Sequence, residues 1–222
     1  MSPANSPVLC YVTERRTLDA PAGTAAEAAV LETAARAAAA GVDWIQIREP
    51  DLAGGALLHL AAECVRRCAP ARILVNDRLD VALAAGAGGV HLGGRGLPVA
   101  AVRGWCHQHA PAEFLVGASC HSPEEARAAE RDGADYLFFG PVFATPSKLA
   151  YGPPQGLDRL AEAARAVRIP MLAIGGVTPQ NAAACIAAGA RGVAAIRWFQ
   201  QRELATAVAA LRAACRQPGT NG

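Results

Sequence analysis

The sequence has no long uninterrupted apolar run and no marked excess of charge of either sign. No stretch of about 18 consecutive apolar residues occurs, so no membrane-spanning helix is predicted. The formal net charge is +2, and acidic and basic residues are interspersed, so neither nucleic acid nor an anionic membrane surface is expected as a partner. Residues 1–16 have no basic segment leading into a long apolar run, so no signal peptide is expected.

The seven cysteines include no Cys-x-x-Cys pair. Cys64 and Cys68 are four residues apart on an expected helix, but only His59 is close enough in sequence to add a third zinc ligand. We therefore predict reduced cysteines, several of them packed in the core, in a cytosolic protein.

Short apolar runs alternate with longer stretches rich in alanine, leucine, glutamate and arginine. The runs predict eight strands, at residues 8–13, 44–49, 72–77, 89–93, 114–120, 136–141, 171–176 and 192–197. The stretches predict eight helices, at residues 25–40, 54–67, 79–85, 98–110, 123–132, 156–167, 179–188 and 199–215.

Strands that are almost entirely apolar, each followed by a helix, are typical of parallel strands buried on both faces. We therefore predict an α/β protein, a single (β/α)8 TIM barrel over residues 1–222 with flexible tails at 1–7 and 216–222. An open doubly wound sheet is the alternative, but segment 11–23 after the first strand is a poor phosphate-binding loop. The pattern of helix end, glycine, small residue and strand recurs at every second strand, and predicts helix-ending glycines at Gly41, Gly86, Gly133 and Gly189.

Polar residues collect where the predicted strands end, which is the end of a TIM barrel that carries the active site. Gly175 and Gly176, with the backbone of Ile196 and Arg197, are predicted to bind a phosphate, although the glycines alone also suit a simple turn. The loop after the sixth strand adds the anion-binding groups Thr145, Ser147 and Lys148 and suits a lid or a surface connection.

Other strand ends carry groups suited to anions, metal and proton transfer. Gln46 and Arg48 share a face and are predicted to bind a pyrophosphate or carboxylate, unless Arg48 forms a salt bridge with Asp77 or Glu49. Asn76 precedes Asp77, a single carboxylate that suits Mg²⁺. On the fifth strand, Ser119 and His121 share a face, and His121 is the best candidate for proton transfer, a buried core histidine being the alternative. His91 is interpreted as structural.

These motifs, in this order, resemble the thiamine phosphate synthase / TenI family of (β/α)8 barrels. The matching stretches are QIRE, LVNDRLDVALAAGAGGVHLG, VGASCHSPEEA, GADYLFFGPVFATPSK, GPPQGL and AIGGVTPQNA, which together extend over nearly the whole chain. The resemblance implies thiamine biosynthesis, with small phosphorylated thiazole and pyrimidine ligands, and leaves a homodimer open. The synthase joins an aminopyrimidine diphosphate to a thiazole phosphate with release of pyrophosphate and uses Mg²⁺. TenI-type tautomerases move a proton on thiazole carboxylate phosphate and need no cofactor.

By that resemblance, each site residue takes a role. The pyrimidine diphosphate is held by Gln46, Arg48, Asn76, Ser119 and Lys148, and Mg²⁺ by Asp77. The thiazole phosphate is held by Thr145, Ser147, Gly175, Gly176, Ile196 and Arg197. His121, with Ser119 beside it, corresponds to the histidine that transfers the proton in the tautomerases.

Three departures bear on the choice of reaction. Pro50 replaces a lysine of the synthase motif, Gly96 replaces its second Mg²⁺-binding aspartate, and Arg197 replaces a serine. The first two changes remove groups that handle Mg²⁺ and pyrophosphate, so a metal-free thiazole tautomerase is the leading hypothesis. The retained Asn76–Asp77 pair and the TPSK motif favour a divergent synthase as the alternative. A non-catalytic protein that binds a thiamine precursor is the third.

Overall fold

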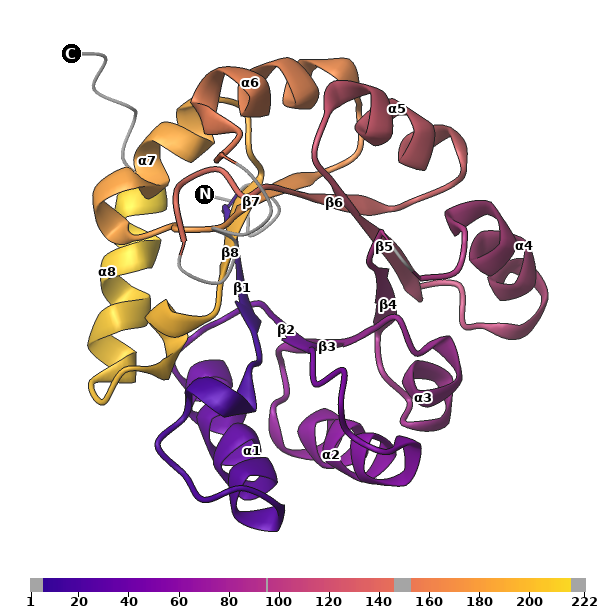
Figure 1. The fold of residues 1–222 in the computed structure, drawn as a ribbon, viewed down its shortest axis with the longest axis vertical. Helices are drawn as coiled ribbons and strands as arrows, with labels where there is room; N and C mark the ends of the chain where they lie inside the picture. Colours follow the sequence, from indigo (N-terminus) through magenta and orange to yellow (C-terminus); the bar gives the residue numbers. More distant parts are fainter. Residues whose placement is uncertain (1–5, 95, 146–152, 217–222) are drawn as a thin grey trace.

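The computed structural model describes residues 6–94, 96–145 and 153–216. Within them, parallel strands form a closed barrel in the order β1 to β8, and Figure 1 shows the ring of strands with the helices outside it. The (β/α)8 barrel is confirmed, and the open sheet is excluded because β8 pairs with β1. The strands are β1 Val8–Val12, β2 Trp44–Ile47, β3 Arg72–Asn76, β4 Gly89–Leu92, β5 Leu115–Cys120, β6 Tyr136–Phe139, β7 Met171–Ile174 and β8 Gly192–Ala195.

Each strand is followed by a helix, and α8 packs against both α7 and α1, which closes the outer ring (Figure 1). The helices are α1 Thr24–Ala39, α2 Gly54–Arg67, α3 Leu79–Ala84, α4 Val99–His109, α5 Pro123–Arg131, α6 Gly156–Ala166, α7 Pro179–Ala187 and α8 Leu204–Arg216. Short 3₁₀ helices follow β1 and β8, at η2 Arg15–Thr17 and η4 Arg197–Gln200.

The last helix is the one whose start was predicted wrongly. The sequence pattern suggests a helix from residue 199, but α8 begins at Leu204. Phe199 belongs to η4 instead, where its buried ring packs against Tyr11 with a centroid separation of 5.8 Å. The apolar character of Phe199 thus serves the loop at the barrel mouth.

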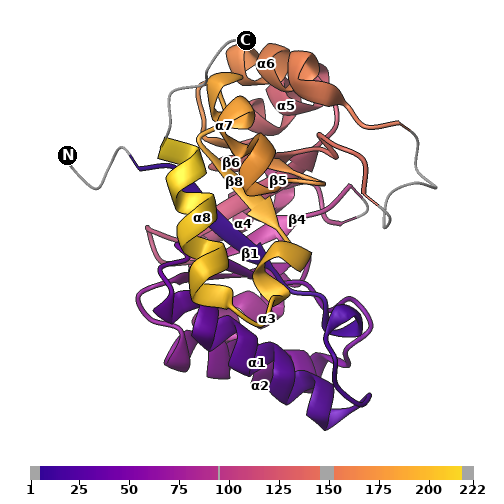
Figure 2. The same ribbon diagram turned by 90° about the vertical axis from the view of Figure 1, so that its left-hand side faces the viewer.

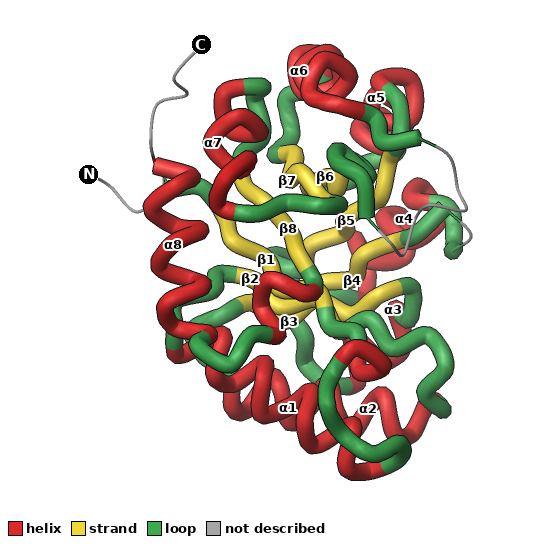
Figure 3. Tube along the Cα trace, turned by 60° about the vertical axis from the view of Figure 1, so that its left-hand side comes forward, coloured by secondary structure: helices red, strands yellow, loops and turns green. Residues whose placement is uncertain are grey.

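The barrel has two apolar layers, which explains why its strands are apolar on both faces. The larger layer lies between strands and helices, and the smaller one fills the inside of the barrel. Figures 2 and 3 show the helices outside the strands from two other directions. Burying both faces of each strand contributes on the order of 25 cal/mol per Å² of apolar surface removed from water. The interior layer, which includes Leu74, Tyr136, Phe138 and Leu172, forms the floor under the mouth of the barrel.

The glycines predicted to end helices have the backbone that this role requires. Gly41, Gly86, Gly133 and Gly189 have φ values of +95°, +67°, +94° and +102°, in the left-handed region that glycine adopts without a Cβ clash. All seven cysteines are free and buried, whereas the sequence predicted core packing for several of them. No helix among the described residues is long and apolar enough to cross a membrane. The cytosolic location stays a prediction.

Candidate active site

A cavity of about 650 Å³ opens at the carboxyl ends of the strands. Most of the residues predicted for the site line it: Gln46, Arg48, Asn76, Ser119, His121, Thr145, Gly175, Gly176, Ile196 and Arg197. They come from six different strand ends, so the topology alone brings them together. Ser147 and Lys148 lie outside the described residues. Asp77 does not line this cavity, and lines instead a separate pocket with residues of α3 and α4.

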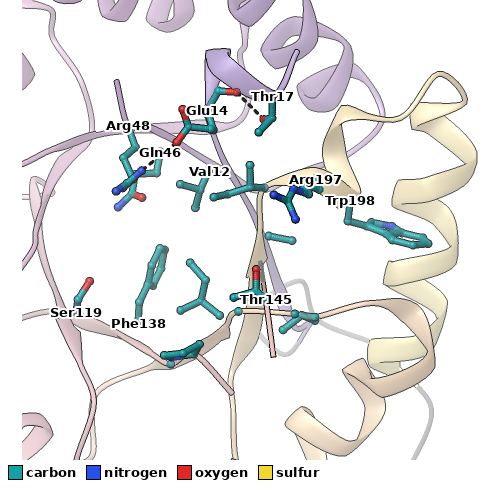
Figure 4. Close-up of a pocket in the computed structure, with 18 of the residues that line it drawn as sticks. Val12, Glu14, Thr17, Gln46, Arg48, Ser119, Phe138, Thr145, Arg197 and Trp198 are labelled. Carbon is teal, nitrogen blue, oxygen red and sulfur yellow. Dashed lines mark hydrogen bonds and ion pairs between the residues drawn. The ribbon is translucent and has the colours of Figure 1, made fainter. Parts of the chain in front are cut away.

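Gln46 and Arg48 form one wall of the cavity (Figure 4). Gln46 is 2% exposed, and its Nε2 atom has no hydrogen-bond partner among the described residues, so a buried donor is left available for a ligand. Arg48 lies 3.4 Å from Glu14 Oε2, and its backbone N–H donates to Thr13 Oγ1 at 2.9 Å. The alternative prediction, that Arg48 forms a salt bridge with Asp77 or Glu49, is wrong. The neighbour that Arg48 has instead, Glu14, follows β1.

The loop after β1 is a part of the site that the sequence pattern did not indicate. Glu14, Arg16 and Thr17 all line the cavity, beside Val12 at the end of β1. Figure 4 shows Glu14 and Thr17 above Val12, with Arg48 on one side of the cavity and Arg197 on the other. The sequence pattern presents segment 11–23 only as a poor phosphate-binding loop of an open sheet. Its polar residues directly after a barrel strand were the signal that could have found it.

Two glycines and the start of α7 form the cavity wall at the carboxyl end of β7. Gly175 and Gly176 have φ values of +95° and +66°. A β-carbon on Gly176 would lie 2.7 Å from the Ala144 carbonyl oxygen, so only glycine allows this close approach. Asn181 ties the turn to α7, because its Oδ1 accepts from Thr178 N–H at 2.8 Å and its Nδ2 donates to the Gly176 carbonyl at 3.0 Å. The turn is therefore held in one shape beside the cavity.

Arg197 stands at the rim across the cavity from Arg48, at the start of η4 (Figure 4). Its side chain is exposed and, within the described part of the chain, makes no ion pair or hydrogen bond. An unpaired guanidinium at the mouth of a cavity attracts anionic ligands such as phosphates and carboxylates.

His121 has one ring nitrogen engaged and one free among the described residues. Its Nδ1 contacts the Gly140 carbonyl oxygen, which only accepts hydrogen bonds, so Nδ1 carries the proton. The neutral ring then has an unprotonated Nε2, which is the form of a general base. Its backbone N–H donates to Glu125 Oε2 at 2.7 Å, which links the strand end to the first turn of α5. The core-histidine alternative is wrong, because His121 is exposed at the cavity.

His91 was interpreted as structural, and its burial at 1% exposure agrees with that. However, it also lines the cavity, and its Nε2 lies 2.9 Å from Ser119 Oγ. Burial, with a smaller effect from Arg48, lowers the pKa of His91 to about 3, so its ring is neutral near pH 7. The strand position of His91 was visible in the sequence, but its link to Ser119 depends on the pairing of β4 with β5.

The described residues do not fit the Mg²⁺ site that the resemblance implied. Both Asp77 oxygens are engaged, because Oδ1 accepts from Gly93 N–H at 2.7 Å and Oδ2 accepts from Asn76 Nδ2 at 2.8 Å. No group of three or more His, Cys, Asp or Glu side chains in the described ranges is arranged to hold a metal ion. Mg²⁺ on a phosphate substrate is usually held by one or two available carboxylates. Here Asp77 does not line the cavity, and Glu14, which does, is paired with Arg48.

Comparison with known proteins identifies relatives. Residues 17–199 match the model of the family described as thiamine monophosphate synthase. A putative thiamine-phosphate synthase of Geobacter sulfurreducens is 48% identical over 163 residues, covering 72% of this chain and 74% of that protein. A thiamine-phosphate synthase of Methanocella arvoryzae is 46% identical over 180 residues, covering 80% and 83%. Thiamine phosphate pyrophosphorylase from Pyrococcus furiosus has a similar structure, with a TM-score of 0.81, 30% identity and coverage of 95% and 96%.

Proposed function

Because this chain belongs to the thiamine monophosphate synthase family, we propose that it is a thiamine-biosynthesis enzyme whose barrel mouth binds a phosphorylated thiazole. The Gly175–Gly176 turn and the backbone at Ile196 and Arg197 hold the phosphate. Thr145 lies beside the turn and adds a hydroxyl. The thiazole ring then lies in the cavity between these groups and the β5 strand end, within the reach of His121.

For the reaction we propose a metal-free proton transfer on the thiazole, as in a thiazole tautomerase. The observation that carries this choice is the state of the Asp77 carboxylate, which accepts hydrogen bonds from Gly93 N–H and Asn76 Nδ2. Gly96 supplies no second carboxylate beside it. His121 Nε2 removes a proton from one ring position, and the imidazolium returns a proton at another, so no group leaves the substrate. The Gly140 carbonyl oxygen holds the imidazole ring by its Nδ1–H and stabilises the imidazolium during the transfer.

A thiamine phosphate synthase is the second candidate. The names of the relatives favour it. So does Gln46 Nε2, a buried donor that has no partner among the described residues and lies on the cavity wall with Arg48. That wall suits a second ligand, the aminopyrimidine diphosphate. Arg48 and Arg197 supply positive charge for its leaving pyrophosphate.

The decisive experiment gives purified protein thiazole carboxylate phosphate alone, and again with aminopyrimidine diphosphate, each with Mg²⁺ or with EDTA. Tautomer formation that is unaffected by EDTA and lost in His121→Ala supports the tautomerase. Rapid Mg²⁺-dependent formation of thiamine phosphate overturns it in favour of the synthase. Tight binding of either ligand with no turnover in any mixture indicates a non-catalytic binding protein.

A further inference from the structure

A chain of three side chains crosses the inside of the barrel and ends at the cavity. The Tyr136 hydroxyl lies 3.1 Å from His91 Nδ1, and His91 Nε2 lies 2.9 Å from Ser119 Oγ. Tyr136 and His91 are each 1% exposed, whereas Ser119 is partly exposed at the cavity wall. The Tyr136–His91–Ser119 chain therefore connects the barrel floor to the ligand space.

The strand register explains how Tyr136 reaches a residue two strands away. Gly117 on β5 pairs with His91 on β4 and with Tyr136 on β6, so the three residues form one row across the sheet. A β-carbon on Gly117 would lie 2.0 Å from Tyr136 Cζ. Since Gly117 has no side chain, the phenol ring occupies that space and extends to His91. The edge of Trp44 packs on the ring at a centroid separation of 4.9 Å and holds it there.

The direction of the hydrogen bonds follows from what each group has available. Burial raises the pKa of Tyr136, so its hydroxyl keeps its proton, and His91 is neutral. Among the described residues, His91 is the sole partner of the Tyr136 hydroxyl. If Tyr136 accepted from His91, its own proton would be buried without a partner, which is unfavourable. Tyr136 therefore donates to Nδ1, and the Nε2–H of His91 donates to Ser119 Oγ.

We propose that Tyr136 and His91 are positioning residues that fix the Ser119 hydroxyl as a hydrogen-bond donor to an anionic oxygen of the ligand. Ser119 has a single hydroxyl proton. Because its oxygen already accepts from His91, that proton points to the cavity, where it binds a phosphate or carboxylate oxygen and disfavours a ligand group that can only donate. The identity of the ligand rests on the proposed function, whereas the donor–acceptor direction of the Tyr136–His91–Ser119 hydrogen bonds does not.

The direction is tested on the ligand-free protein by nuclear magnetic resonance with ¹⁵N-labelled histidine, using His91→Asn to assign the signal. We expect His91 to carry its proton on Nε2 in the wild type and in Tyr11→Phe. Tyr11 is the matched control, since it is also fully buried and its hydroxyl accepts from Gln200 Nε2 at 3.4 Å, outside the Tyr136–His91–Ser119 hydrogen bonds. In Tyr136→Phe we expect both tautomers. A wild-type His91 that carries its proton on Nδ1 overturns the inference.

The action through Ser119 is tested by calorimetry with thiazole carboxylate phosphate, whose carboxylate is an anionic group separate from the phosphate held at the Gly175–Gly176 turn. Ser119→Ala and Tyr136→Phe should each weaken binding, Ser119→Ala by about tenfold to a hundredfold, as expected for the loss of one hydrogen bond to a charged group. The double variant should bind no more weakly than Ser119→Ala, because Tyr136 acts through Ser119. Additive losses overturn the inference. Failure of the wild type to bind thiazole carboxylate phosphate overturns the proposed function alone, because the magnetic resonance experiment on His91 uses no ligand.

Discussion

Gly96 lies so close to Asp77 that a β-carbon at residue 96 would come within 2.5 Å of the Asp77 Oδ1 atom. The loop after β4 therefore faces the carboxylate that follows β3, and Gly93 N–H from the same loop donates to it. A second carboxylate at residue 96 would stand directly beside the first. The contact is with the end of a side chain, so a small rotation of Asp77 relieves it.

Gly96→Asp should therefore strengthen Mg²⁺ binding at this loop. The two carboxylates repel each other, and a divalent cation offsets that repulsion. Isothermal calorimetry should show Mg²⁺ binding that is measurably tighter than in the wild type. Gly96→Ala is the control, because it adds the same β-carbon without charge. Equal Mg²⁺ affinity in the Asp and Ala variants would show that the loop moves away from Asp77.

His121→Asn should lower kcat for tautomer formation by about 10²–10⁴-fold, the usual contribution of a general base. Asparagine still donates to the Gly140 carbonyl oxygen, so KM should change little. The control is His59→Asn, an exposed histidine on α2. A variant that retains more than a tenth of wild-type kcat would exclude His121 as the base.

Arg197→Ala should weaken the binding of the phosphorylated thiazole by about tenfold or more, because a charge-assisted contact is lost. Arg197 has no partner among the described residues, so the melting temperature should stay unchanged. Arg127→Ala is matched to it as an exposed arginine remote from the cavity, 3.6 Å from Glu124 on α5. Unaltered affinity in Arg197→Ala would mean that the guanidinium does not contact the ligand.

Gly176→Ala should destabilise the protein by about 1–3 kcal/mol, the usual cost of a strained backbone position. The residue has a φ of +66°, and the added carbon would lie 2.7 Å from the Ala144 carbonyl oxygen. Gly55→Ala in α2 is the control, because nothing lies within 4 Å of its added carbon and alanine favours helices. Urea unfolding should separate the two variants, and similar stabilities would contradict the close approach at Gly176.

The burial of His91 should make the protein less stable in acid. Its pKa is about 3 in the folded chain and 6.5 as a reference, so between these values the unfolded state binds more protons. Stability is thus fully present above about pH 6.5 and falls by up to about 1.4 kcal/mol per pH unit toward pH 3. Urea unfolding at several pH values should show a shallower decline for His91→Gln, and parallel curves would contradict a neutral, buried ring.

The strands, most helices and the rim of the site were predictable because local pattern and topology determine them. Apolar runs mark the strands, and closure of the barrel brings every strand end to one rim. The partners of individual side chains were not predictable. Arg48 forms an ion pair with Glu14 because β2 pairs with β1. Asp77 accepts a hydrogen bond from Gly93 N–H because of the path of the loop after β4. Such contacts depend on register and on atomic positions, which one sequence does not encode in any local pattern.

The presence of glycine, with no side chain, at residue 117 has a consequence for engineering this barrel. It makes three neighbouring strands dependent on one another, since the space above residue 117 is occupied by a side chain from β6 that ends at a side chain from β4. Gly117→Ala would displace Tyr136 and free His91, even though residue 117 itself is absent from the cavity wall. Redesign of the ligand space for another substrate therefore has to treat residues 91, 117 and 136 as a single unit of substitution.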